Sequence, residues 1–317
     1  MKNRNFRESV LKNDKLGLFI ALIAISVLFS SLSPYFFTYK NLINILIAAS
    51  LVGLVAIGES YLVIAGYVDL SAGSVAAFSG VLTSILLLNG YNTATTLLIV
   101  IVCGALIGVI NASMVNYLRL ESFIATLATM SIFRGFAYIL CEGKPVFISN
   151  RTFLKIGVDR IFGVPIPIII LLIAFIIFGI VLKNTTFGRN IYIIGGNKTA
   201  ARLAGINPRK VTLIAFMINA SLAALGGAIL ASRMTSGQPA ASVGLEFDAI
   251  TAAVLGGIAF SGGVGTIFGT FLGVLILQGF NNGLLIMNVP SFWQQVARGL
   301  LLIAALMFDY IRTKNRK

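Results

Sequence analysis

The chain has 317 residues, of which 58% are hydrophobic and only 11% are charged, and its mean hydropathy is +0.97. A water-soluble domain carries about 25% charged residues, so this composition excludes a soluble globular protein and makes lipid the main solvent. The net charge is +14, but the basic residues gather at the two ends and in one central loop. A nucleic-acid binder needs a continuous basic face, so we expect no nucleic acid as a partner.

Ten apolar segments follow one another along the chain, and each approaches the roughly 20 residues that a membrane-spanning helix needs. We predict helices at 17–32, 41–65, 71–88, 94–117, 122–140, 164–182, 211–232, 247–261, 264–282 and 291–310. The third and eighth segments are short or glycine-rich, which indicates broken or re-entrant helices. The predicted fold is an all-α polytopic membrane protein, a single transmembrane domain over 1–317 with about ten transmembrane helices.

The distribution of Lys and Arg between alternate loops predicts the orientation. With the N-terminus inside, 16 of the 24 basic residues fall in inner segments and only 6 in outer segments. Loops on the cytoplasmic side carry such an excess of positive charge. We therefore predict a multi-pass protein of the bacterial cytoplasmic (inner) membrane, surrounded by lipid, with both termini in the cytoplasm.

The longest inner loop, 183–210, carries six basic residues and no acid. Asn197 can cap a short helix, Gly205 is suited to ending it, and Pro208 prevents its resumption. A solvated loop that only sets topology would explain the charges. It would not explain an apolar face of small side chains, which favours docking against a partner; this face is formed by Ala200, Ala201, Leu203, Ala204 and Ile206.

The longest outer loop, 141–163, is also basic. It either covers the bundle or contacts a soluble partner outside the membrane. The residues that we expect in such a contact are Lys144, Arg151, Lys155 and Arg160, together with Arg233.

No chemical motif is visible. The sequence has no histidine, and its two cysteines do not form a disulfide framework. The nearest approach to a phosphate-binding loop, at 195–199, lacks the glycine that must precede the lysine. We therefore expect no catalytic residue, no cofactor, no metal site and no ATP binding in this chain.

Charged residues at membrane depth are a sharper signal. Arg134 and Arg298 would each cost roughly 3 kcal/mol at a helix centre, and Glu59 lies deep in the second segment. Asp69 and Asp248 stand at segment edges, where capping the following helix is a more economical interpretation than substrate contact.

Neutral polar groups and small residues also interrupt the later segments. Gln278, Asn281, Asn282 and Trp293 would suit a hydrated path for a solute rich in hydroxyl groups, because such solutes bind amides and aromatic faces. Hydrogen bonding between helices is an equally good interpretation. The pairs Gly104/Gly108 and Gly269/Gly273 have the spacing of close helix packing.

Several sequence blocks stand in a fixed order: 68–74 (VDLSAGS), 122–127 (SFIATL) followed by Arg134, 187–189 with 195–207, 246–263 and 281–284. Together they resemble the membrane-spanning permease subunits of ribose-type, simple-sugar ABC importers, over about residues 15 to 312. One departure precedes the first block. The family usually has glycine two residues before the signature Asp, whereas this chain has Tyr67 there and Gly66 one residue earlier.

The resemblance implies partners and roles. A second permease subunit, forming a homodimer, would complete the path, a periplasmic sugar-binding protein would deliver the sugar, and a cytoplasmic ABC ATPase would drive alternating access. The residues expected to couple to the ATPase are Gly195, Gly196, Asn197, Ala200, Ala201, Arg202, Leu203, Gly205 and Ile206. Those expected along the path are Asp69, Ser71, Phe123, Thr126, Asp248, Gln278, Asn281, Asn282 and Trp293.

The resemblance identifies the family more specifically than it identifies the substrate. The overall pattern is most similar to ribose permeases, while 260–266 also resembles galactose-type relatives. Another simple sugar or autoinducer-2 is an alternative within the family. Outside the family, an ion-coupled secondary transporter lacks a clear acidic or histidine relay here, and a membrane enzyme lacks a chemical constellation.

Overall fold

A computed structural model describes residues 14–314. The basic ends 1–13 and 315–317, on which part of the predicted orientation rests, lie outside the described residues. Each of the ten predicted segments contains a helix. In chain order these are α2 (Asp14–Leu32), α3 (Tyr39–Ile64), α4 (Ala72–Leu88), α5 (Thr93–Asn116), α6 (Ser122–Leu140), α8 (Ile166–Asn184), α11 (Pro208–Met234), α12 (Leu245–Leu255), α13 (Ile267–Ile286) and α14 (Ser291–Lys314).

Seven of the described helices are long and apolar enough to cross a membrane, namely α3, α5, α6, α8, α11, α13 and α14. The helices α2 and α4 are apolar but shorter over their hydrophobic windows. The predicted segment 247–261 is broken, because α12 covers only 11 residues and ends against Gly256 and Gly257. The chain is therefore an all-α polytopic membrane protein.

Side-chain caps begin many of these helices. Thr38, Asn92 and Thr266 each accept a hydrogen bond from a backbone N–H in the first turn of α3, α5 and α13. Such a cap satisfies one of the N–H groups that have no partner within the helix and stabilises it by about 1 kcal/mol. Polar residues between apolar runs thus decide where the helices start.

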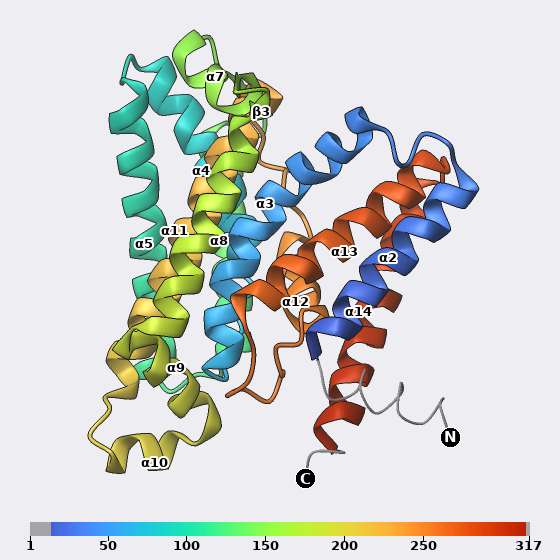
Figure 1. Cartoon of the computed structure of the whole chain (residues 1–317). Helices are drawn as coiled ribbons and strands as arrows, with labels where there is room; N and C mark the ends of the chain where they lie inside the picture. The colour runs from blue at the N-terminus through green and yellow to red at the C-terminus, as the bar shows by residue number, and fades with distance from the viewer. Residues whose placement is uncertain (1–13, 315–317) are drawn as a thin grey trace, which may run out of the picture.

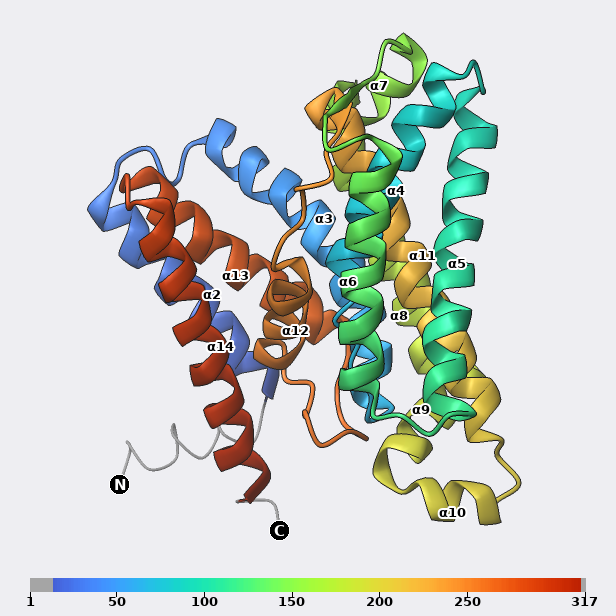
Figure 2. The same ribbon diagram turned by 180° about the vertical axis from the view of Figure 1, so that it is seen from behind.

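The helices form two groups that α3 joins. On one side α11 packs against α4 and α5, and α4 packs against α6; on the other, α13 packs against α2 and α12, and α12 against α14. Figure 1 and Figure 2 show these groups side by side, with α3 crossing from one to the other. Most of the apolar window of both α3 and α11 is buried, as expected for helices that are hydrophobic on every side.

The predicted small-residue pairs lie at close helix crossings. Gly104 and Gly108 of α5 face the backbone of α11, and Gly269 and Gly273 of α13 face the backbone of α12. A Cβ at any of these positions would overlap with the neighbouring chain. The packing interpretation of both pairs is confirmed.

The two ends of the bundle carry different short elements. One end has α7 (Arg151–Val158), a ladder of β1 (Val146–Phe147) with β4 (Ser236–Gly237), and a hairpin of β2 (Arg160–Ile161) with β3 (Val164–Pro165). The opposite end has α9 (Thr186–Gly196) and α10 (Lys198–Leu203). The described ends of the chain, at the start of α2 and the end of α14, lie toward the α9–α10 end (Figure 1).

Candidate functional site

The turn between α3 and α4 depends on Gly66. This residue has φ +79°, in the left-handed region that disfavours any residue with a Cβ. Gly66 N donates to Val63 O at 3.0 Å and Tyr67 N donates to Leu62 O at 2.9 Å, which is the Schellman arrangement that closes a helix C-terminus. The geometry therefore requires glycine at 66, and the departure from the family pattern at Tyr67 leaves the turn intact.

Asp69 lies at the centre of a hydrogen-bond network. Ser71 donates to Asp69 Oδ1 from its amide at 2.8 Å and from its hydroxyl at 2.6 Å. The Asn111 amide of α5 donates to both Asp69 oxygens, at 3.4 and 3.3 Å. The Asn219 amide of α11 bridges two carboxylates, donating to Asp69 Oδ2 at 3.1 Å and to Glu59 Oε1 at 3.0 Å.

All five residues of this Asp69 network are 0% exposed. A buried polar group costs free energy unless it is hydrogen-bonded, so the network holds the turn against α3, α5 and α11 together.

The first turn of α6 also binds the backbone of the α3–α4 turn. Val68 N donates to Ser122 Oγ at 3.1 Å, and Leu70 N donates to Thr126 Oγ1 at 3.0 Å. Phe123, one residue along from Ser122, is 55% exposed and lies on a different face of the helix. Two sequence blocks of the resemblance, 68–74 and 122–127, thus meet in space.

Both capping predictions at membrane depth are wrong. The N-cap of α4 is Ser71, and Asp69 instead accepts from Ser71 just before the helix starts. Asp248 lies inside the first turn of α12, whose N-cap is Gly244. Its carboxylate is 3.6 Å from Arg298 NH1 of α14, so it ties two helices together.

The remaining residues expected along the path lie on α13 and α14. Asn282 exchanges two hydrogen bonds with Asn41 of α3, at 2.8 and 3.0 Å, while Gln278 is buried. Asn281 is half-buried and its Oδ1 has no partner among the described residues. Trp293 is 66% exposed. The expected path residues therefore do not form one cluster.

Arg134 of α6 is satisfied by backbone oxygens. Its NH1 donates to Pro239 O at 2.7 Å and to Ala241 O at 2.6 Å. Charged groups within membranes commonly pair with backbone carbonyls. The arginine thereby fixes the connection between α11 and α12 onto α6.

The α9–α10 segment has the predicted form. Asn197 Oδ1 accepts from Thr199 N at 2.9 Å and from Ala200 N at 3.0 Å, and Gly205 follows α10 with φ +77°. The capped helix is confirmed. Ala201 is fully buried, whereas Leu203 is 86% exposed, so α10 presents a large apolar side chain outward.

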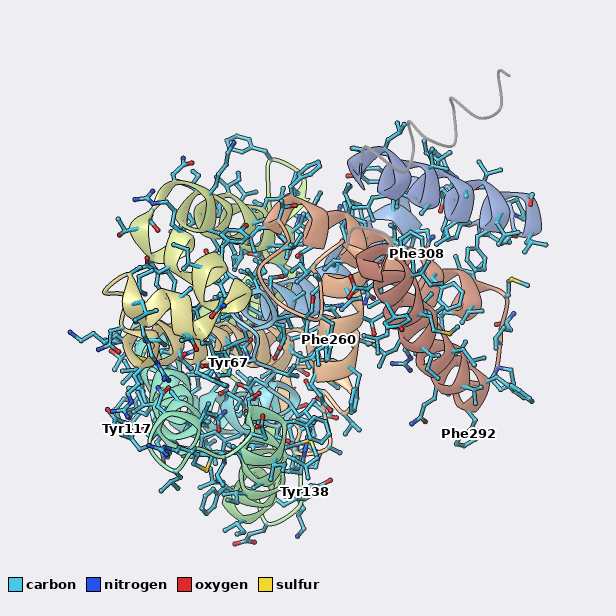
Figure 3. The ribbon with its side chains drawn as sticks, turned by 90° about the horizontal axis from the view of Figure 1, so that it is seen from below. Tyr67, Tyr117, Tyr138, Phe260, Phe292 and Phe308 are labelled. Atoms are coloured by element: carbon cyan, nitrogen blue, oxygen red, sulfur yellow. The ribbon has the colours of Figure 1, made fainter. Side chains whose placement is uncertain are left out.

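Three glycine-containing segments meet where α3 ends. Gly263 N, in the loop after α12, donates to Ile64 O at 2.8 Å. Gly195 of α9 lies so close that a Cβ there would collide with both of these backbone groups. Lys198 of α10 places its Nζ 4.1 Å from the centre of the Tyr67 ring, a cation–π distance. Tyr67 lies near the middle of the molecule when it is seen from the α10 end (Figure 3).

The basic residues expected to dock a soluble partner all belong to the α7 end. Each is exposed, and they lie on or beside α7 and the short strands; they are Lys144, Arg151, Lys155, Arg160 and Arg233. Within residues 14–314 the structure contains no group of three or more His, Cys, Asp or Glu side chains that could hold a metal ion.

Comparison with known proteins identifies the family. Residues 41–306 match the family model described as branched-chain amino acid transport system / permease component. The chain is 39% identical over 308 residues to the L-arabinose transport system permease protein AraH of Escherichia coli K12, covering 96% of this chain and 93% of that protein. It is 38% identical over 298 residues to the ribose import permease protein RbsC of Bacillus subtilis 168, covering 93% and 92%.

A third relative is the ribose import permease protein RbsC of Haemophilus influenzae, 36% identical over 302 residues and 94% of each chain. No solved structure matches the chain. The chain belongs to this family of ABC-importer permeases, as the resemblance implied. It is a multi-pass protein of the bacterial inner membrane, and members of its family are transport components rather than enzymes.

Sequence reasoning missed the partners of Asp69. Glu59 was visible only as a charge at membrane depth, and neither Asn111 nor Asn219 was singled out. The available signal was an amide inside each of two mainly apolar segments, Asn111 in 94–117 and Asn219 in 211–232. Such a residue must find a partner inside a bundle.

Proposed function

We propose that this chain is the permease subunit of a binding-protein-dependent importer for a monosaccharide, with ribose as the first candidate substrate. Its support is similarity along more than nine-tenths of the chain to permeases named for ribose and for L-arabinose, which are both pentoses. The chain supplies the path and its connection to an ATPase, and no chemistry. Galactose, other simple sugars and autoinducer-2 are the competing substrates.

In this proposal α9 and α10 face the cytoplasm and receive the ATPase. The exposed Leu203 suits an apolar pocket on the partner, and the backbone contacts of Gly195 lead from α9 to the end of α3. The α7 end faces the periplasm and receives the sugar-binding protein through its exposed basic residues. A second copy of the chain completes the path, and both termini are cytoplasmic.

The orientation is tested with single cysteines. Leu203→Cys on α10 and Lys155→Cys on α7 are both exposed positions at opposite ends of the molecule. A membrane-impermeant maleimide should label Lys155→Cys in intact spheroplasts and Leu203→Cys only in inside-out vesicles. The parent chain, with Cys103 and Cys141, measures the background. The reverse pattern would overturn the proposed sidedness.

The ATPase contact is tested by a pull-down from native membranes. Replacing 200–206 with Gly-Ser should abolish recovery of an ATPase and abolish uptake, while the protein remains inserted. The matched control replaces Arg151 and Lys155 with Gln; it should keep the ATPase and weaken only the response to the binding protein. Recovery of the ATPase with the replaced loop would contradict the assignment.

The substrate is tested by uptake of labelled ribose in vesicles that contain the recovered ATPase and binding protein. Unlabelled ribose should compete best, ahead of arabinose and galactose. A protonophore should leave ATP-driven uptake unchanged, because the gradient is not its energy source. Uptake that persists without the ATPase and stops with the protonophore would instead indicate a secondary transporter.

A further inference from the structure

A cavity of about 680 Å³ opens between α8 and α13. Its wall on α8 follows one helix face, from Leu172 through Phe175 and Gly179 to Lys183, and its other wall is the first turn of α13. Phe175 and Phe271 meet edge to face across it, with ring centres 5.1 Å apart. The two helices are thus in contact along the cavity through this aromatic pair.

The length of the cavity matches one leaflet of a bilayer. Leu172 and Lys183 are 11 residues apart on α8, which corresponds to about 16 Å along a helix that rises 1.5 Å per residue. The hydrocarbon core of a membrane is roughly 30 Å thick, so one leaflet contributes about 15 Å. The apolar wall therefore spans the depth of a single acyl chain rather than that of the whole membrane.

The polar groups of the cavity gather at one end. Lys183 and Asn184 are exposed at the end of α8, and Tyr192 of α9 stands beside them. The Tyr192 hydroxyl already donates to Gly265 O at 2.8 Å, and Thr266 Oγ1 already accepts from Gly269 N at 3.0 Å. A sugar would find too few free hydrogen-bonding groups here, because each buried hydroxyl without a partner costs free energy.

The positive charge at this end of the cavity favours a negatively charged ligand. Lys183 is not within ion-pair distance of an acid among the described residues. It begins the segment 183–210, which carries six basic residues and no acid. Lysine and tyrosine commonly mark the depth of lipid headgroups, and basic pockets between transmembrane helices bind anionic headgroups.

We propose that this cavity is a binding site for one anionic phospholipid, with an acyl chain along α8 from Leu172 to Gly179 and its phosphate beside Lys183. The lipid comes from the leaflet that surrounds the α9–α10 end. It fills the open apolar space between α8 and α13. The proposal does not depend on which sugar the transporter carries.

The test uses the purified full-length chain and native mass spectrometry. After mild delipidation, the wild-type chain should retain one phosphatidylglycerol in preference to phosphatidylcholine. Lys183→Gln should reduce this preference about fivefold, since a lysine near a membrane surface is worth about 1 kcal/mol to an anionic lipid. Arg189→Gln, in the same basic segment but outside the cavity lining, is the matched control and should leave the preference unchanged.

A second variant tests the acyl chain. A Cβ at Gly179 would make only an ordinary contact with Ile267, so Gly179→Leu can fill the cavity without striking the backbone, and it should abolish retention of both lipids. Gly299→Leu on α14, where a Cβ meets nothing within 4 Å, should retain the lipid. A phosphatidylglycerol with a photoreactive acyl chain should crosslink to 172–179 and 267–271 in the wild type. Equal retention of both lipids, or crosslinks spread over all apolar helices, would overturn the proposal.

Discussion

The helices α3 and α14 are both apolar enough to cross a membrane, but α3 is surrounded mostly by other helices of this chain and α14 is not. In α3, 61% of the apolar window is buried inside this chain, whereas in α14 only 6% is buried. Glu59 of α3 is enclosed with Asn219, while Arg298 of α14 is 38% exposed beside Asp248. Hydropathy identifies both as possible spans but does not tell whether lipid or protein covers them, because both surroundings are apolar.

We call the buried helices around α3 and α11 the scaffold. By contrast, α14 presents a face that remains open to partners outside this chain. Figure 2 shows α14 on the outside of its group, away from α11, and Figure 3 places Phe292 of α14 at the edge of the molecule. Lipid or a second subunit must cover such a face in the membrane, whereas α3 needs no further cover.

The largest effect should come from glycine substitutions that contrast the two regions. In Gly108→Leu the new side chain would collide with the backbone of Phe216 and Met217 on α11. Backbone cannot move aside as a side chain can, so we expect a loss of about 3 kcal/mol or more and little folded protein. In Gly299→Leu on α14 the side chain meets open space, and the monomer should remain folded. Size-exclusion profiles and thermal unfolding in detergent measure both. Equal yields would contradict the comparison.

An intermediate effect should follow from removing the bridging amide. Asn219→Ala leaves Glu59 and Asp69 without a shared donor in a fully buried site, and we expect about 2–3 kcal/mol of destabilisation. The control is Asn281→Ala on α13, whose Oδ1 has no described partner; it should cost less than about 1 kcal/mol. The midpoint of thermal unfolding reports the difference, and a larger loss for Asn281→Ala would show that the network is not the scaffold.

The smallest effect should be that of Arg298→Ala. Its contact with Asp248 is 3.6 Å long and partly exposed, and pairs of this kind contribute about 0–1 kcal/mol. The unfolding midpoint of the monomer should therefore change little. A loss as large as that of Asn219→Ala would mean that α14 belongs to the scaffold after all.

The sequence was sufficient for the ten apolar helices and for the capped α10, because both follow from local patterns, but it did not indicate α7 or α9. Ten apolar runs and the capping side chain of Asn197 could be identified without knowing the fold. The sequence could not show that Asn111 and Asn219 meet Asp69, since these residues are 42 and 150 positions apart from it along the chain. The capping predictions for Asp69 and Asp248 were wrong because they considered only neighbouring residues. The positions of these side chains depend on residues distant in the sequence, namely Asn219 for Asp69 and Arg298 for Asp248.

The contact of Ile64, Gly195 and Gly263 affects how a movement of α9 reaches α3. Two packed helices usually touch through side chains, which can change rotamer and so absorb a small displacement before the next element has to move. Here backbone touches backbone, and no rotamer is available. A displacement of α9 would therefore be transmitted to the end of α3 with little loss, because no side chain between them can rearrange to absorb it.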